Sequence, residues 1–251
     1  MIETAFDDQS EPIITPAKIF GEKRLVCKTC IVTFSEKILQ NVLQSYDCAQ
    51  IAKIGACNGS VPIYGLREGE RTIAVYLSAI GSAVAATDII ETSWLTGAED
   101  FIVFGSAGSL NREATVGKLV VPTAAYRDEG MSYHYAPAAP YIEMPGAKRV
   151  AEVFDRLGVP YVQGRTWTTD AIYRETRARM LQRREEGCLC VEMEAAGAQA
   201  VCSHYGFGLY YFLMTGDVLD LPEWDVGELR RANHCLDNFR LALEIAREVD
   251  K

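Results

Sequence analysis

Histidine and basic segments are scarce in this sequence of 251 residues, and each shortage excludes a class of function. Only three histidines, His134, His204 and His234, accompany the eight cysteines, and zinc sites draw most of their ligands from these two residue types. The chain has 34 acidic and 25 basic residues, a net charge of -9, and no basic run. A nucleic-acid-binding surface is usually basic. We therefore expect no metal, no cofactor and no nucleic-acid partner.

Long apolar runs are also missing. No stretch reaches the roughly 18–20 apolar residues that a membrane-spanning helix needs. The first 24 residues lack the charged-then-apolar pattern of a signal peptide. Several cysteines lie in apolar runs, which is typical of buried free thiols in a reducing compartment. The C-x-x-C at 27–30 lies in a strand-like run, whereas a redox motif with this spacing normally opens a helix. We predict a cytoplasmic protein without a membrane partner.

What the sequence does contain is a regular alternation of apolar strand-like segments with helical segments. The predicted strands are 30–34, 60–66, 71–81, 101–110, 117–126, 161–173, 188–191 and 206–217, and the predicted helices are 35–46, 82–100, 147–160, 174–187 and 226–250, with a further helix of small residues after the strand at 188–191. Near-continuous apolar strands between helices indicate an α/β fold whose sheet is largely parallel or mixed and is covered on both faces. We find no linker or repeat and predict a single domain.

Three of the predicted strands end in residues suited to binding. They are followed by "GSAGSL" (105–110), "VEMEAAG" (191–197) and "TGD" (215–217). Each has an ordinary explanation: a tight turn, a glutamate that complements a helix dipole, and a capping aspartate. In such sheets, however, ligands bind outside the carboxyl ends of the strands. Together, the three segments predict a binding site at one edge of the sheet.

These motifs resemble those of the nucleoside phosphorylase superfamily, which includes purine nucleoside phosphorylases, uridine phosphorylases and methylthioadenosine nucleosidases. "VEMEAAG" is similar to the family's ribose-binding signature, and "GSAGSL" to its Gly-rich loop. "TGD" follows Glu194 at the spacing of the family's catalytic Ser-Asp, with Gly216 in place of the serine. The resemblance covers roughly residues 25–245, so we assign 1–24 to an N-terminal arm and 25–251 to the catalytic domain. It implies a mixed, mostly parallel sheet partly closed into a barrel and flanked by helices.

The resemblance also implies cleavage of the N-glycosidic bond of a nucleoside, with a purine base favoured. Glu194, held ionised by the helix N-terminus, would accept hydrogen bonds from both ribose hydroxyls. Glu192 would support it, and Met193 would offer the sugar an apolar face. Asp217 would be the general acid that protonates N7 of the departing base. Arg230 lies 13 residues after Asp217, at the family's spacing, and would tune it.

Two further positions correspond to the family's base pocket. Tyr173 matches an aromatic residue of the purine pocket, and Ile172 replaces an aromatic neighbour. An alternative interpretation makes Tyr173 an ordinary core residue. The resemblance therefore predicts a base-binding wall at 172–173, in which the second stacking group is missing.

The family's phosphate site is the part that this sequence does not reproduce. The "G-D-P-x-R" loop of the phosphorylases is replaced by a segment with Ser35 and Leu39 at the Gly and Arg positions, and Val103 replaces a second arginine. Gly105 and Ser106 remain in the Gly-rich loop. A phosphate dianion without a bidentate arginine loses its strongest contacts. We therefore predict that water is the acceptor, as in the nucleosidases.

Several alternatives remain open for the acceptor and for the activity. Glu36 is a candidate base for water, whereas Lys37 could supply charge for phosphate. A phosphate-dependent phosphorylase could use relocated cations such as Arg127 or Arg165. A nucleoside-binding protein that lost catalysis is the other possibility. The resemblance further implies a homo-oligomer, a dimer or hexamer, in which a neighbouring subunit completes the site.

Overall fold

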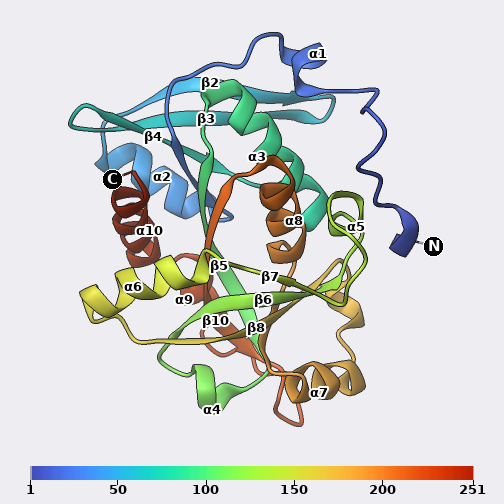
Figure 1. Cartoon of the computed structure of the whole chain (residues 1–251). Coiled ribbons are helices and arrows are strands. Elements are labelled where there is room, and N and C mark those ends of the chain that lie inside the picture. Colours follow the sequence, from blue (N-terminus) through green and yellow to red (C-terminus); the bar gives the residue numbers. More distant parts are fainter. Residues whose placement is uncertain (1, 251) are drawn as a thin grey trace.

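Ten strands form one mixed sheet in the computed structural model, which describes residues 2–250 (Figure 1). The strands are β1 Thr29–Thr33, β2 Cys48–Ala56, β3 Gly59–Glu68, β4 Arg71–Leu77, β5 Asp100–Ser109, β6 Leu119–Asp128, β7 Tyr141–Glu143, β8 Tyr161–Thr169, β9 Cys188–Glu192 and β10 Gly208–Val218. The α-helices are α1 Pro16–Phe20, α2 Glu36–Ser45, α3 Ser82–Thr96, α4 Arg112–Thr115, α5 Ser132–Tyr135, α6 Ala147–Leu157, α7 Arg177–Glu185, α8 Ala195–Tyr205, α9 Leu229–Asn233 and α10 Leu236–Val249. Two short 3-10 helices are η1 Ile2–Thr4 and η2 Ile172–Arg174.

Five of the strands close into a barrel. Strand β10 pairs in parallel with β5 and antiparallel with β6, β6 and β8 pair in parallel, and so do β8 and β9. An antiparallel pairing of β9 with β5 completes the ring. On the other side of β5, the sheet continues through β1, β4, β3 and β2. The prediction of a mixed sheet partly closed into a barrel is confirmed.

Helices cover both faces of this sheet. Figure 1 shows α3, α5 and α8 on one side and α2, α6 and α10 on the other. The small residues of α8 let it pack closely, and its first eight residues are all buried. The sheet side chains between the layers include the fully buried Trp167, Tyr76 and Phe101. Burial of an aromatic side chain of this kind contributes roughly 1.5–3 kcal/mol, so these layers fix the frame that carries the strand ends.

The helix boundaries follow the local sequence signals. Ser35 caps α2, and its Oγ accepts a hydrogen bond from the Ile38 amide at 3.2 Å. Gly97 and Gly158 end α3 and α6 in the left-handed conformation, with φ of 90° and 67°. These ends were predicted correctly because a cap depends on only a few neighbouring residues.

Several predictions of elements were wrong or incomplete. The strand predicted at 161–173 ends at Thr169 and is followed by η2. Strand β2 was missed because it is half-exposed at the sheet edge and so lacks an apolar alternation. The helix predicted at 226–250 is broken into α9 and α10. At the break, Asn233 and His234 turn their side chains to Ser106 and Ser35 respectively. The chain therefore bends toward the sheet instead of continuing as one helix.

The segment before β1 lies along α3. The indole of Trp94 donates to the Gly21 carbonyl at 2.9 Å, and the Arg24 amide donates to the Trp94 carbonyl. Among residues 2–250, no helix has the length and apolar character required to cross a membrane.

Candidate active site

A cavity of about 860 Å³ opens at the ends of β1, β5 and β10, beside the junction of β9 and α8. The register of the strands brings the three sequence motifs together there. Gly108 of β5 lies opposite Val191 of β9, and Ala107 lies opposite Thr215 of β10. The cavity is lined by residues of all three motifs. The expectation that these motifs meet at one edge of the sheet is therefore met.

Glu192 holds the junction between β9 and α8. It is 5% exposed, and its Oε2 accepts hydrogen bonds from the amides of Glu194 and Ala195 at 2.8 and 2.7 Å. Its Oε1 accepts from the hydroxyl of Thr168 at 2.5 Å. Burial raises the pKa of Glu192, and these hydrogen bonds act against that rise. Because the amides at the start of α8 bind Glu192, this residue positions the segment that carries Glu194.

Glu194 occupies the cap position of α8 and faces the cavity. It is 7% exposed, and its Oε1 accepts a hydrogen bond from the Gly81 amide at 2.7 Å. Gly81 has a φ of 114°, which favours glycine. Burial, and then the charge of Glu192, raise the pKa of Glu194 to about 8. The expectation that the helix N-terminus keeps Glu194 ionised is wrong, because Glu192 occupies the helix amides and burial favours the protonated form of Glu194.

Met193, Ile172 and Tyr173 also line the cavity. Tyr173 is 97% exposed and Ile172 is 54% exposed, because both lie on η2 at the cavity mouth, beyond the end of β8. The alternative that Tyr173 is a core residue is therefore excluded. Both side chains are free to contact a ligand that enters between them and Met193.

Asp217 lines the cavity from the end of β10. Its Oδ2 accepts a hydrogen bond at 2.8 Å from the indole of Trp224, a second cavity-lining residue. Arg230, expected beside Asp217, does not line this cavity. It is exposed on α9 and lies in a smaller neighbouring cleft with Lys37 and Arg231. The structure does not bring Arg230 to Asp217.

Neutral polar groups line the part of the cavity where the sequence predicted the loops that bind phosphate or the attacking water. Gly105, Ser106 and Ser35 are all lining residues. Ser35 Oγ lies 2.8 Å from His234 Nδ1, and Ser106 Oγ donates to Asn233 Oδ1. Glu36 and Lys37 lie outside the cavity, because Ser35 ends the loop and the first two residues of α2 are exposed.

The cavity residues that the analysis of the sequence did not predict include Glu175, Arg177, Trp224, Asn233 and His234. None belongs to a recognised motif. The available signal for Glu175 was its position two residues after Tyr173, in a segment interpreted as an exposed helix. Burial, and then the charge of Asp217, raise the pKa of Glu175 to about 7. Such a shift marks a carboxyl group that shares the site with another.

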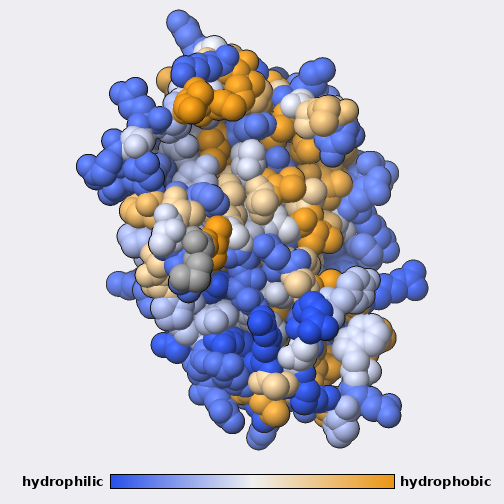
Figure 2. All heavy atoms as spheres, turned by 90° about the vertical axis from the view of Figure 1, so that its right-hand side faces the viewer, coloured by the Kyte–Doolittle hydropathy of each residue, from blue (hydrophilic) through white to orange (hydrophobic). Residues whose placement is uncertain are grey.

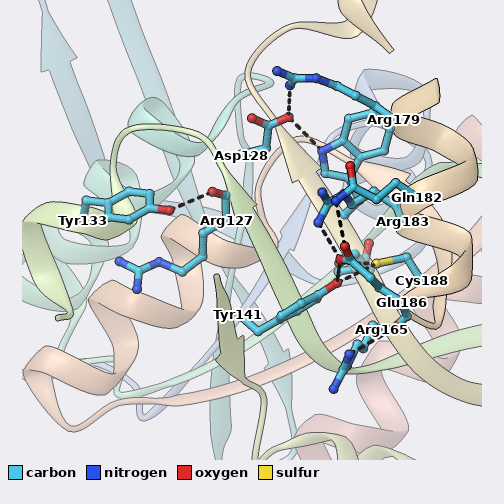
Figure 3. A network of polar contacts seen from close by, with 12 residues as sticks. Arg127, Asp128, Tyr133, Tyr141, Arg165, Arg179, Gln182, Arg183, Glu186 and Cys188 are labelled. Atoms are coloured by element: carbon cyan, nitrogen blue, oxygen red, sulfur yellow. Dashed lines mark hydrogen bonds and ion pairs between the residues drawn. The ribbon is translucent and has the colours of Figure 1, made fainter. Parts of the chain in front are cut away.

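The two arginines considered as relocated phosphate ligands are used elsewhere (Figure 3). The Arg127 guanidinium is buried and donates to the carbonyls of Ala136 and Pro137 at 3.2 and 2.6 Å. Arg165 donates to the Glu186 carbonyl at 2.8 Å and lies over the ring of Tyr141, 4.4 Å from its centroid. Neither of the two arginines lines the cavity.

The residues that the structure describes around the cavity offer little positive charge to an anion. Four carboxyl groups line it, those of Glu175, Glu192, Glu194 and Asp217. The lining cation is Arg177, and its guanidinium donates to the carbonyls of Leu219 and Pro222 at 3.0 and 2.8 Å. In the part of the chain that the structure describes, no group of three or more His, Cys, Asp or Glu could hold a metal ion.

Comparisons with known proteins agree with this geometry. The chain is 27% identical over 191 residues to the DeoD-type purine nucleoside phosphorylase of Exiguobacterium sp., which covers 74% of this chain and 78% of that protein. The structure resembles a futalosine hydrolase mutant of Helicobacter pylori, with a TM-score of 0.71, 16% identity, and coverage of 89% of this chain and 100% of that one. It also resembles the AMP nucleosidase of Bacteroides thetaiotaomicron, with a TM-score of 0.69, 19% identity and coverage of 90% of each chain.

The family model of the Phosphorylase superfamily matches residues 28–240. This match spans most of the chain and includes the Gly-rich loop, the "VEMEAAG" segment and the strand that ends at Asp217. The chain therefore belongs to the phosphorylase superfamily, whose members cleave N-glycosidic bonds of nucleosides.

Proposed function

We propose that this protein is a nucleosidase, which hydrolyses the N-glycosidic bond of a purine nucleoside with water as the acceptor. The observation that carries the proposal is the shortage of cationic side chains around the cavity. Four carboxyl groups and one arginine line it, and that arginine is bonded to backbone carbonyls. A phosphate dianion would lose its hydration without gaining a charge partner, and this is costly. Water needs no such partner.

The proposed roles follow from the positions of the side chains. Glu194, which is buried at the cavity wall, binds the two ribose hydroxyls, and Glu192 holds the segment in place. Met193 and Tyr173 enclose the sugar and the base. Asp217 donates a proton to N7 of the departing purine, which otherwise carries the electrons of the broken bond.

The water side is assigned to Ser35, Ser106 and His234. His234 replaces Glu36 as the proposed base, because it lines the cavity and Glu36 does not. Its Nδ1 is held at 2.8 Å from Ser35 Oγ, which orients the imidazole ring. Histidine is suited to accept the proton of an attacking water near neutral pH.

Named relatives support both parts of the proposal. The purine nucleoside phosphorylase of Exiguobacterium sp. supports the preference for a purine. The two structural neighbours are a futalosine hydrolase and an AMP nucleosidase, and the folds of such hydrolases accommodate water as the acceptor. A cytoplasmic location and a homo-oligomeric state, dimer or hexamer, complete the proposal.

A phosphate-dependent phosphorylase is the second candidate. It is favoured by one observation: the neighbouring cleft that contains Lys37, Arg230 and Arg231 shares His234 with the cavity. A phosphate bound in that cleft would approach the substrate from the water side. The two candidates differ in their products, which are the free sugar for hydrolysis and the sugar 1-phosphate for phosphorolysis.

The test is product analysis with a panel of nucleosides, first in phosphate-free buffer and then with added phosphate. We expect release of free base and free sugar without phosphate. Strict dependence on phosphate, with sugar 1-phosphate as the product, would replace the hydrolase by the phosphorylase. Asp217→Asn should still bind the nucleoside but should turn over roughly 10²–10⁴ times more slowly. Binding without release of base by the unmodified protein would instead indicate a nucleoside-binding protein.

A further inference from the structure

The loop that follows β10 folds back on the end of that strand. Val218, the last residue of β10, and Asp225 exchange two backbone hydrogen bonds of 2.8 and 3.2 Å in an antiparallel bridge. The guanidinium of Arg177 donates to the carbonyls of Leu219 and Pro222 within the loop at 3.0 and 2.8 Å. These bonds hold the loop against the cavity wall, so its side chains have defined places there.

Trp224 is the loop residue that reaches the proposed acid. It precedes Asp225 in the bridge just as Asp217 precedes Val218, which makes Trp224 and Asp217 diagonal neighbours on one face. An aromatic side chain spans such a diagonal, and the Trp224 indole N–H donates to Asp217 Oδ2 at 2.8 Å. Both residues line the cavity. Trp224 is 63% exposed, so packing in the core does not account for its position.

This hydrogen bond distinguishes the two oxygens of Asp217. The indole N–H is a donor only, so Oδ2 is the accepting oxygen. Among residues 2–250, the Asp217 carboxyl group has no other hydrogen bond. Its Oδ1 lies 3.5 Å from the position of a Cβ on Gly108, which also lines the cavity. A protonated carboxyl group accepts best through its carbonyl oxygen, so the indole on Oδ2 favours a proton on Oδ1, the oxygen without a partner.

The donor on Asp217 is neutral, in contrast to the arginine that the sequence suggested. Arg230 has the expected spacing but lines the neighbouring cleft. A guanidinium is always charged, and a cation beside a carboxyl group favours loss of the carboxyl proton. An indole N–H orients the carboxyl group without adding that charge. A neutral donor therefore suits a carboxyl group whose role is to donate a proton.

We propose that Trp224, and not Arg230, is the positioning residue of Asp217. Its indole N–H holds Oδ2 and leaves Oδ1 as the oxygen that presents the proton to the departing base. The inference rests on the proposed role of Asp217 in cleaving a nucleoside and adds the residue that orients this acid. It assigns a role to an exposed tryptophan that belongs to none of the sequence motifs.

The kinetic test removes the indole N–H but keeps an aromatic ring. In Trp224→Phe, we expect kcat for a purine nucleoside to fall about 10-fold or more, because the acid loses its orientation. The KM should change less than kcat, since the proton is needed most as the bond breaks. Trp94→Phe is the matched control and should keep the kcat of the unmodified protein. It also loses an indole hydrogen bond, to the Gly21 carbonyl, and Trp94 does not line the cavity.

The same substitution in Asp217→Asn separates positioning from a merely structural role. A residue that acts through Asp217 has nothing to orient when the acid is absent, so Trp224→Phe should cause no further fall in kcat in this background. A structural role would slow both backgrounds by the same factor. Such an equal fall would overturn the inference, and so would a full kcat in Trp224→Phe alone.

A spectroscopic measurement tests the contact without turnover. The chain has three tryptophans, so the NMR spectrum of protein with isotope-labelled indole nitrogens is simple, and Trp224→Phe identifies the Trp224 signal by its loss. Asp217→Ala should shift that signal and leave the Trp94 signal in place. A Trp224 signal that does not move would overturn the inference. If no nucleoside is cleaved, the proposed function fails, whereas the indole signal still decides whether Trp224 holds Asp217.

Discussion

At the scale of single residues, Glu192 and Glu194 show how environment separates two identical side chains. Glu192 accepts two backbone amides and a threonine hydroxyl, so its oxygens are used within the protein. Glu194 accepts amide hydrogen bonds from Gly81 and Met193 and still lines the cavity. The first residue positions the junction, whereas the second is available to a ligand. Their different roles depend on which amides each carboxyl group reaches.

The proposed ribose contact makes Glu194→Gln informative. The amide side chain keeps the shape but accepts hydrogen bonds more weakly, so we expect kcat/KM for a ribonucleoside to fall by on the order of 10²–10³. The kcat/KM for a 2′-deoxynucleoside should fall less in this variant, because that substrate lacks one of the two hydroxyls. Steady-state kinetics on both substrates provide the measurement. An equal fall in kcat/KM for the two substrates would show that Glu194 does not bind the ribose hydroxyls.

The raised pKa of Glu194 predicts a pH dependence of ribose binding. Burial and Glu192 raise this pKa to about 8, so Glu194 is protonated below that pH and ionised above it. Only the ionised form accepts from both hydroxyls without itself donating. The affinity for a ribonucleoside should therefore increase as the pH rises through this pKa. The dissociation constant is best measured on Asp217→Asn, which turns over slowly; an affinity that decreases over the same pH range would contradict the prediction.

At the scale of elements, β5 must pass very close to β10 and β9 to form the cavity wall. A Cβ placed on Gly108 would lie 2.5 Å from Leu219 Cδ1 and 3.1 Å from Val191 Cγ1. It would also lie 3.5 Å from Asp217 Oδ1. A methyl group at this position therefore requires the Leu219 side chain to move. The close approach of the Gly-rich strand is what allows Asp217 and the "VEMEAAG" segment to face one cavity.

Gly108→Ala should consequently affect the site more than the fold. The side chain of Leu219 must move to admit the methyl group, and this changes the packing next to Asp217. We expect a fall in kcat/KM of about 10-fold or more, and a loss of about 1–3 kcal/mol in the free energy of unfolding. Gly55→Ala is the control, because no heavy atom lies within 4 Å of its added Cβ and its stability should change by about 0.5 kcal/mol or less. Full activity in Gly108→Ala would show that the wall is not tightly packed.

At the scale of the whole molecule, apolar side chains remain exposed. Ile13, Ile14 and Leu25 are 87%, 71% and 85% exposed. Ile80, at the cavity, is 68% exposed. Figure 2, which shows the face at the right of Figure 1, has hydrophobic patches in its upper half among charged residues. Exposed apolar surface of this kind is typical of interaction sites, and a second copy of the chain would cover it.

We therefore expect the protein to sediment as a dimer or hexamer. Replacing both Ile13 and Ile14 by glutamate adds charge to a chain that is already acidic and should shift the equilibrium toward monomer. Val116→Glu is the control, since this exposed valine follows α4, far from the N-terminal arm (Figure 1). Sedimentation velocity measures all three proteins. A monomeric unmodified protein at micromolar concentration would refute the expectation.

The sequence by itself determined the features that depend on neighbouring residues. The cap at Ser35, the helix ends at Gly97 and Gly158 and the alternation of apolar strands with helices were all predicted, because each signal lies within a few positions of the element it defines. The motifs also predicted the family and the barrel. Leu39 and Val103, at the expected arginine positions, are indeed core residues.

Only the tertiary structure decided which polar side chains share the cavity. Glu194 bonds an amide 113 residues away, and Glu175 lines the same cavity as Asp217 only because the loops after β8 and β10 both reach it. Arg230 lies outside the cavity although its spacing in the sequence is right, because its side chain is exposed on α9 and lines the neighbouring cleft. No pattern of neighbouring residues encodes such contacts. They arise from the register of β5 with β9 and β10, because the closing of the barrel brings distant strand ends to one place.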